Sequence, residues 1–240
     1  MNSGMYAALS GSISAQKRLE VLTNNLANAN TTGFKADRIE FQSLLAQKTG
    51  ATPNSETPVF STETFSTDFT SGTLQHTENL LDVALQGDGF FVVNTPNGPA
   101  YTRQGNFHRA ASGRIVNADG YEVQGTGNLS VNASRIEITG KGEIMADGVQ
   151  QGTLTVVDFP KPYQMNKVGN GLFAPANAQA APTAVTTTEV KQGYLEGSNV
   201  QVVREMARMI EASRYFDICT RAVRNYDDIS SKAANDLGKI

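Results

Sequence analysis

Apolar residues recur at helical spacing at both ends of this chain, and the long stretch between the ends lacks that pattern. Near the N-terminus, residues 2–28 contain no proline and carry apolar side chains at separations built from three and four. Such spacing places side chains on one face of a helix. The sequence therefore predicts a first amphipathic helix, whose packing face comprises Met5, Leu9, Leu19 and Leu22.

A second amphipathic helix is predicted from residue 198 onward. Apolar residues recur there at four-three spacing over three heptads, which is typical of a coiled-coil seam. This face, with one adjoining position, comprises Val202, Met206, Met209, Ile210, Phe216 and Val223. An apolar line on a different face comprises Ala212, Tyr215, Cys219, Ala222, Tyr226 and Ile229. One partner helix cannot cover both faces, so we expect contacts with further copies of the chain.

The region between the helices is different in texture. Its apolar runs shorten to three or four residues, β-branched residues are frequent, and Gly and Pro recur, which indicates strands joined by tight turns. The Asp-Gly pairs at 119–120 and 147–148 stand where a two-residue hairpin turn needs positive φ. We therefore expect an α+β fold, in which discontinuous terminal helices, paired like a coiled coil, flank a central, mainly antiparallel β domain.

The change of pattern predicts three regions. Residues 1–35 together with 196–240 form a terminal helical domain, and residues 76–195 form the central β domain. Residues 36–75 link the two. A short helical pattern between Ile39 and Leu45 predicts a further helix in this linking segment.

Composition argues against several function classes. The 20 basic and 23 acidic side chains give a net charge of −3, so no overall positive field favours nucleic acid. Two histidines and one cysteine do not suffice for a common zinc site, and no motif implies a cofactor.

No apolar run approaches the roughly 20 residues of a membrane span, and the opening residues lack the pattern of a cleaved secretory signal. We expect no enzyme, because no spacing unites Cys219 with His76 or His108.

These patterns favour a self-assembling structural protein. A head-to-tail contact that does not close produces a filament, and the terminal helices offer such contacts. The alternative from another class is a secreted β module that binds a ligand and is dimerised by the helices. The sequence offers it little support, because it contains no tryptophan and no identifiable cluster of exposed aromatic residues.

Several stretches of the sequence resemble the bacterial flagellar rod and hook proteins. Residues 23–35 (TNNLANANTTGFK) resemble the N-terminal signature of that family. Residues 81–93 (LDVALQGDGFFVV) and 101–107 (YTRQGNF) resemble its central β region. Residues 193–200 (GYLEGSNV), which run into residues 205–217, resemble its C-terminal helix. Together the stretches span almost the whole chain in the order of the family.

The resemblance implies a subunit of the flagellar basal-body rod. Such a subunit passes through the flagellar type III export apparatus without a cleaved signal peptide and assembles in the periplasm with its own copies and with other rod subunits. The resemblance also implies that the terminal helices form an inner tube, that residues 36–75 contact neighbours, and that the β domain faces outward. The assembly motif that shapes the helix exit would comprise Asn24, Asn25, Leu26, Ala27, Asn28, Gly33 and Phe34.

Within the family, the chain resembles the proximal-rod subunit more than the distal-rod subunit, which stays the alternative. The features that favour the proximal type are the opening residues 5–11 (MYAALSG), the short acidic middle and the modest length. A hook protein usually carries a larger extra domain than 240 residues allow. Cys219 and the tail 230–240 match no pattern that we can assign.

Overall fold

The computed structural model describes residues 2–44, 60–127, 129–130, 135–177, 181–185 and 187–237. Its contacts divide the chain into two units, each assembled from segments that are far apart in the sequence. The first unit comprises residues 1–27, 37–68 and 201–240. The second unit comprises residues 28–36 and 69–200. The predicted three-region layout, with its boundaries at residues 35, 75 and 195, stays a prediction.

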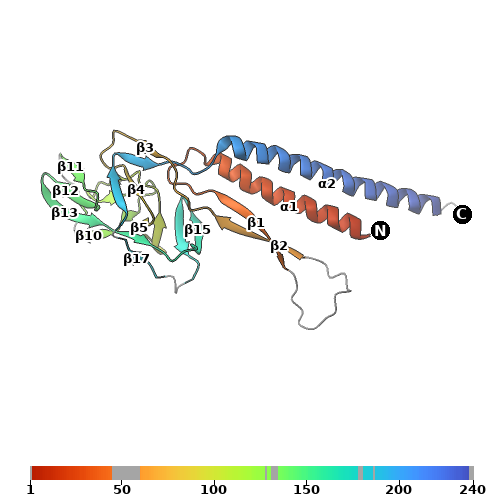
Figure 1. The fold of residues 1–240 in the computed structure, drawn as a ribbon, viewed down its shortest axis with the longest axis horizontal. Coiled ribbons are helices and arrows are strands. Elements are labelled where there is room, and N and C mark those ends of the chain that lie inside the picture. The colour runs from red at the N-terminus through yellow and green to blue at the C-terminus, as the bar shows by residue number, and fades with distance from the viewer. Residues whose placement is uncertain are drawn as a thin grey trace. The chain divides into compact units, whose positions relative to one another are not determined.

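In the first unit, α1 (Asn2–Ala27) and α2 (Val202–Leu237) lie side by side (Figure 1). The helix α1 ends where a run of Asn, Thr and Gly residues offers turn geometry. The first turn of α2 carries Glu205, whose negative charge favours the positive end of the helix dipole. The unit also contains β1 (Asp37–Leu44) and β2 (Phe60–Thr67), which pair antiparallel in unbroken register.

The short helix predicted between Ile39 and Leu45 is wrong where the structure describes it, because residues 37–44 form β1. Leu45 lies outside the described residues. The partner strand β2 has the sequence FSTETFST, and aromatic and β-branched residues favour strands. A run of eight residues with a few apolar positions does not distinguish a helix from a strand until its pairing partner is known.

The seam between α1 and α2 uses members of both apolar lines on α2. Among the α2 residues whose side chains are described, those that are buried or half-buried are Glu205, Met209, Ala212, Phe216, Cys219, Thr220, Ala222 and Val223. All of them except Thr220 and Ala222 recur at heptad spacing. On α1, Ala15 and Leu22 are buried. The intramolecular seam therefore takes alternate residues from the two predicted faces instead of covering one of them.

Two glycines of α1 lie against large side chains of α2. A Cβ atom added at Gly4 would lie 2.4 Å from the hydroxyl oxygen of Tyr226. One added at Gly11 would lie 3.0 Å from Sγ of Cys219 and 3.2 Å from the hydroxyl oxygen of Tyr215. A hydrogen bond with Cys219 raises the pKa of Tyr215. Small residues of α1 thus let α2 approach closely, as in other tightly packed helix pairs.

Replacing Gly11 by leucine should open this seam. The added side chain has no room beside Cys219, and overpacking of this kind costs roughly 1–3 kcal/mol. Cys219 is the single cysteine of the chain and is buried, so its rate of reaction with a thiol reagent reports the opening. We expect the Gly11→Leu variant to react at least about tenfold faster than the parent protein. The control is Ser10→Leu at the exposed neighbouring position; equal rates in both variants would contradict the proposed contact.

The second unit is built from antiparallel strands (Figure 1). The largest sheet has the order β15-β16-β6-β5-β9-β8-β7, with β14 pairing β5 and β17 pairing β14. Its strands are β5 (Phe90–Thr95), β6 (Gly98–Thr102), β7 (His108–Arg109), β8 (Ile115–Val116), β9 (Glu122–Val123), β14 (Val156–Asp158), β15 (Met165–Gly169), β16 (Leu172–Pro175) and β17 (Thr183–Ala184).

Three smaller sheets complete the unit among the described residues. One has the order β10-β13-β12-β11, and two are the pairs β18-β4 and β19-β3. Their strands are β3 (Leu74–His76), β4 (Val83–Gln86), β10 (Gly125–Gly127), β11 (Ile136–Ile138), β12 (Glu143–Ala146), β13 (Val149–Leu154), β18 (Glu189–Gln192) and β19 (Tyr194–Glu196). All strand pairs in the described part are antiparallel, which confirms the predicted α+β fold.

The two predicted hairpin turns differ. Between β12 and β13, Asp147 and Gly148 both have positive φ (50° and 83°) and form the predicted two-residue turn. At the other Asp-Gly pair, Gly120 has a φ of 84°, but the loop from β8 to β9 spans residues 117–121, so the prediction of two residues is wrong there. The side-chain oxygen of Asn117 accepts hydrogen bonds from two backbone N–H groups of this loop, at 3.1 and 2.8 Å, which stabilises the longer turn.

The core lies on both faces of β5. Phe91 and Val93 point to one apolar cluster, and Phe90 and Val92 to the other. Alternating side chains of a strand lie on opposite faces, and here both faces are covered. The second cluster is largely aromatic and comprises Phe90, Val92, Tyr101, Val157, Phe159, Met165 and Phe173, with Phe69 and Tyr163 packed against it.

Candidate assembly site and its buried ionic junction

After the end of α1 at Ala27, residues 28–36 form a compact turn that belongs to the second unit. The N–H of Thr31 donates to the carbonyl of Asn28 at 3.1 Å, and the N–H of Phe34 donates to the carbonyl of Thr31 at 3.3 Å. These two local hydrogen bonds reverse the chain without forming a helix or a strand. The turn brings Phe34 into a buried position.

Gly33 makes the turn possible. Its φ of 65° lies in the left-handed region, which glycine adopts without steric cost. A Cβ atom there would lie 2.5 Å from the backbone nitrogen of Gln104 and 2.6 Å from the carbonyl carbon of Arg103. The N–H of Gly33 donates to the carbonyl of Glu196 at 2.7 Å. Both the conformation and the close approach therefore require glycine at this position.

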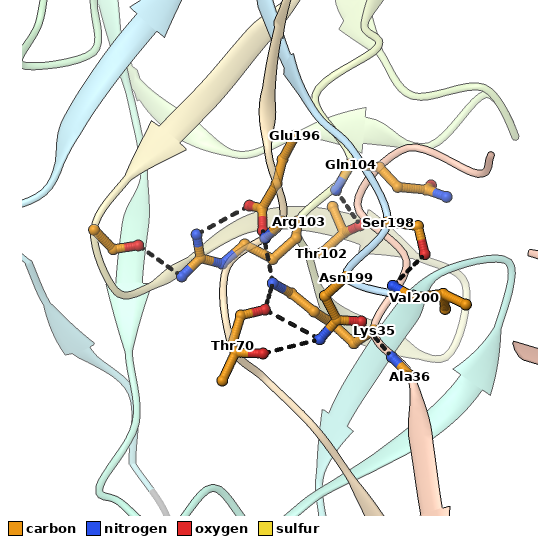
Figure 2. Close-up of polar contacts among 12 residues, drawn as sticks. Lys35, Ala36, Thr70, Thr102, Arg103, Gln104, Glu196, Ser198, Asn199 and Val200 are labelled. Carbon is orange, nitrogen blue, oxygen red and sulfur yellow. Dashed lines mark hydrogen bonds and ion pairs between the residues drawn. The ribbon is translucent and has the colours of Figure 1, made fainter. Parts of the chain in front are cut away.

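Lys35 follows the turn and lies in an ionic junction with Glu196 and Arg103 (Figure 2). The three residues are 1%, 1% and 3% exposed, respectively. Nζ of Lys35 lies 2.6 Å from Oε1 of Glu196 and donates to the carbonyl of Thr70 at 2.8 Å. Nη1 of Arg103 donates to Oε2 of Glu196 at 3.2 Å, and the N–H of Gly72 donates to Oε1 at 2.9 Å. One carboxylate thus accepts from two cations and from the backbone.

The ionic junction combines two cations and one carboxylate, none of them more than 3% exposed. Burying an ion costs several kcal/mol unless close partners offset the loss of hydration. Arg103 obtains further partners, because its Nη2 donates to the carbonyl of Gly87 at 2.8 Å and its guanidinium lies 5.4 Å from the ring centre of Phe90. Burial raises the pKa of Tyr163, a hydrogen bond to Asp158 adds to the rise, and the charge of Arg103 opposes it.

Asn199 forms a second tie beside the ionic junction (Figure 2). Its side-chain oxygen accepts from the N–H of Ala36 at 2.8 Å, and its side-chain nitrogen donates to both the carbonyl and the hydroxyl oxygen of Thr70 at 3.2 Å. The N–H of Asn199 donates to the carbonyl of Phe34 at 3.4 Å. The segment before α2 and the segment after α1 are therefore joined by side-chain and backbone hydrogen bonds.

Lys167 covers the motif from the edge strand β15. Its Nζ lies 4.4 Å from the ring centre of Phe34 and donates to the carbonyl of Lys35 at 2.7 Å. A cation over an aromatic face contributes about 0.5–1 kcal/mol or more when it is shielded from water. The ring of Phe34 is thus anchored by charge as well as by burial.

The structure places the predicted assembly-motif residues at different depths. Asn25 is buried, and its side-chain amide bonds both the N–H and the carbonyl of Asp37, at 2.9 and 2.8 Å. The Asn25 amide therefore satisfies both backbone groups of Asp37, the first residue of β1, as a neighbouring strand would. Of the other motif residues, Gly33 and Phe34 are buried, Leu26 and Asn28 are half-buried, and Asn24 and Ala27 are exposed.

The predicted helix-packing residues are also divided in the first unit. Leu22 is buried, whereas Met5, Leu19, Met209, Phe216 and Val223 are half-buried. Leu9, Val202, Met206 and Ile210 are exposed. Together with four neighbours these form what we call the exposed helix faces: Tyr6, Leu9 and Ile13 of α1, and Val202, Val203, Met206, Ile210 and Ile218 of α2.

Sequence reasoning missed the ionic junction. Lys35 and Glu196 are 161 positions apart, and nothing in their local patterns indicates burial. A signal was nevertheless present, because Lys35, Arg103 and Glu196 each lie inside one of the stretches that carry the family resemblance. The small residues Gly4 and Gly11 at the helix seam were missed as well, since the spacing analysis considered large apolar residues.

The described residues give no sign of metal chemistry or of a membrane span. In the part of the chain that the structure covers, no three His, Cys, Asp or Glu side chains gather closely enough to hold a metal ion. None of the helices described there combines the length and the apolar character that crossing a membrane requires.

Comparisons with known proteins cover the same regions. Family models match at residues 5–35 (flagella basal body rod protein), 84–146 (flagellar hook protein FlgE/F/G D1 domain) and 191–237 (flagellar basal body rod FlgEFG protein C-terminal). The chain is 36% identical to the flagellar basal-body rod protein FlgF of Rhizobium meliloti over 245 positions, with 99% of each chain covered. It is 33% identical to FlgG of Agrobacterium fabrum and 32% identical to FlgG of Bacillus subtilis, with 96% of this chain and 97% of each relative covered.

The chain combines paired terminal helices with an antiparallel β region, and its ionic junction joins residues 23–35 to residues 193–200. Together with the family match at residues 5–35, this architecture is that of a structural subunit of a flagellar axial assembly. More narrowly, the chain belongs to the family of flagellar basal-body rod proteins. Members of this family are structural proteins and not enzymes, and they assemble with other rod components of the flagellum.

Replacing Glu196 by glutamine should destabilise the second unit strongly. The variant keeps the size of the side chain but removes the negative charge that both Lys35 and Arg103 contact, and breaking a buried pair costs about 3–5 kcal/mol. Chemical denaturation followed by circular dichroism measures the change. The control is Asp88→Asn, whose partner Lys161 is more than half exposed and which should cost less than about 1 kcal/mol. Equal losses in both variants would contradict the importance of the ionic junction.

Proposed function

We propose that this protein is a proximal-rod-type subunit that self-assembles through its terminal helices into the axial drive shaft of the flagellum. Export through the flagellar type III apparatus and assembly with its own copies and with other rod subunits belong to the same proposal. The observation that carries it is the set of large apolar side chains on the exposed helix faces. The assembly-motif residues and the three-region layout are parts of this proposal too.

The exposed helix faces support an assembly that involves other molecules. Val203 is 83% exposed, Ile218 is 64% exposed and Tyr6 is 61% exposed, although helix faces in water are ordinarily polar. Burial of apolar surface stabilises an association by roughly 25 cal/mol for each Å² removed from water. Because α1 and α2 already contact one another along a different seam, further helices are the partners that suit these faces.

The length of the chain is closer to that of the FlgF relative than to those of the two FlgG relatives. The alignment with the FlgF relative extends over 245 positions and covers 99% of this chain of 240 residues. The alignments with the two FlgG relatives extend over 255 and 257 positions and cover 96% of it. The chain thus has nearly the length of the FlgF relative, whereas the FlgG relatives require longer gaps. Modest length is the feature that the resemblance associates with the proximal-rod subunit.

A charged residue on an exposed helix face should prevent assembly without unfolding the protein. Met206 is 47% exposed, so Met206→Asp should change the free energy of unfolding by less than about 1 kcal/mol. Its carboxylate would be buried without a partner in an assembled tube. We expect at least about a tenfold loss of the variant from isolated basal bodies, measured by immunoblotting. The matched control is Val149→Asp, an exposed apolar position outside the helices, which should be incorporated normally; normal incorporation of Met206→Asp would contradict the proposal.

Deletion of the gene in the host bacterium tests the place of the subunit in the rod. A proximal-type subunit is needed before later rod subunits can attach, so electron microscopy of basal bodies should show rods that stop early. Complementation with the parent gene is the control. Rods that lack just their outer part would instead favour the distal type.

A further inference from the structure

The segment between α1 and β1 obtains its order from distant residues. Besides its two local turns, residues 28–36 bond to the segment just before α2, through Gly33, Lys35 and Ala36. The partners are the backbone carbonyl of Glu196, its carboxylate and the side chain of Asn199. No helix or strand is present in residues 28–36, so these bonds hold the conformation together with the contacts from Thr70 and Lys167.

The dependence runs in both directions. Residues 197–200 follow β19 without regular secondary structure. Asn199 is tied to Phe34 through its backbone and to Ala36 through its side chain, and the carboxylate of Glu196 loses one of its two cations if Lys35 withdraws. Each segment therefore supplies a large share of the bonds that order the other.

The junction also opposes half-formed states. If the N-terminal segment were released alone, Lys35 would reach water, but Glu196 would stay buried with a single cation and one fewer hydrogen bond. If the segment before α2 were released alone, Lys35 and Arg103 would both lose the carboxylate of Glu196. The first state removes the shortest hydrogen bond of a buried carboxylate, and the second removes the negative charge beside two buried cations. Both losses favour joint closure or joint release.

We propose that the ionic junction and Asn199 form a conformational latch between residues 28–36 and residues 196–199. In this latch each segment is ordered while the other is in place, and release of one releases the other. The N-terminal motif therefore orders after the chain has been completed to residue 199, although it is made first. The latch operates within a single copy of the chain and does not depend on the proposed function.

Hydrogen exchange of the full-length protein, followed by mass spectrometry, tests the latch with two matched variants. Lys35→Met and Arg103→Met each remove one buried cation and leave Glu196 paired with the other. Their net buried charge is therefore the same. Lys35 belongs to the N-terminal segment, whereas Arg103 does not. We expect Lys35→Met to speed exchange at least about tenfold in peptides covering both residues 28–36 and 196–200, with β5 unchanged. Arg103→Met keeps the Lys35–Glu196 pair that joins the two segments, so it should speed exchange in both segments by a smaller factor.

Asn199→Ala supplies a neutral test, in case Lys35→Met lowers the stability of the whole unit. It removes the acceptor of the Ala36 N–H without changing a charge, and it should also speed exchange in residues 28–36 by about tenfold. The proposal is overturned if residues 28–36 are released while residues 196–200 stay protected, or if Lys35→Met and Arg103→Met affect all peptides equally. It is also overturned if neither Lys35→Met nor Asn199→Ala speeds exchange.

Discussion

The structure depends on one buried carboxylate. Glu196 accepts hydrogen bonds from Lys35, Arg103 and the backbone of Gly72, and each donor comes from a different part of the sequence. A buried charge tolerates little displacement of its partners. If its hydrogen bonds lengthen, the lost hydration of the charge is no longer compensated in the apolar surrounding. The chain passes between the two units after residues 36, 68 and 200, among other points. Each of these three points lies within two positions of a residue that is hydrogen-bonded in or beside the junction, namely Ala36, Thr70 or Asn199. Within the second unit, the hydrogen bonds of Ala36, Thr70 and Asn199 hold the segment ends next to these points.

The helix pair follows a different physical rule from the one that a search for apolar stripes assumes. Its intramolecular seam places Gly4 and Gly11 of α1 against Tyr226, Tyr215 and Cys219 of α2. Small residues allow a short distance between helix axes, so dispersion contacts accumulate without large apolar side chains on both sides. The large side chains of α1 that are not needed in this seam lie at the surface. On α1 these side chains are Tyr6, Leu9 and Ile13.

Local patterns were sufficient to predict the two helices, the β region and the α+β fold, because periodicity and turn residues act over a few positions. The Asp147-Gly148 turn was predictable for the same reason, since both residues accept positive φ. The strand β1 was not, because its conformation depends on pairing with β2. The longer turn at Asn117 depends on one side-chain amide, and the ionic junction depends on residues up to 161 positions apart. The Asn117 loop apart, whose bonds are local, the features that sequence reasoning missed require a distant partner.

The ionic junction takes one charged side chain from each of the three family-like regions. Lys35 lies in the first matched region, Arg103 in the second and Glu196 in the third. Residues 36–83 lie outside all three, and their hydrogen bonds to the junction come from the carbonyl of Thr70 and the N–H of Gly72. At Thr70 the junction uses a backbone carbonyl, which does not require a particular side chain, whereas an ammonium, a guanidinium and a carboxylate each do. Gly72 is constrained for a different reason, because a Cβ atom there would overlap the backbone carbonyl oxygen of Gly197. The junction thus requires charged side chains in the three matched regions and a glycine at position 72 in the segment between the first two.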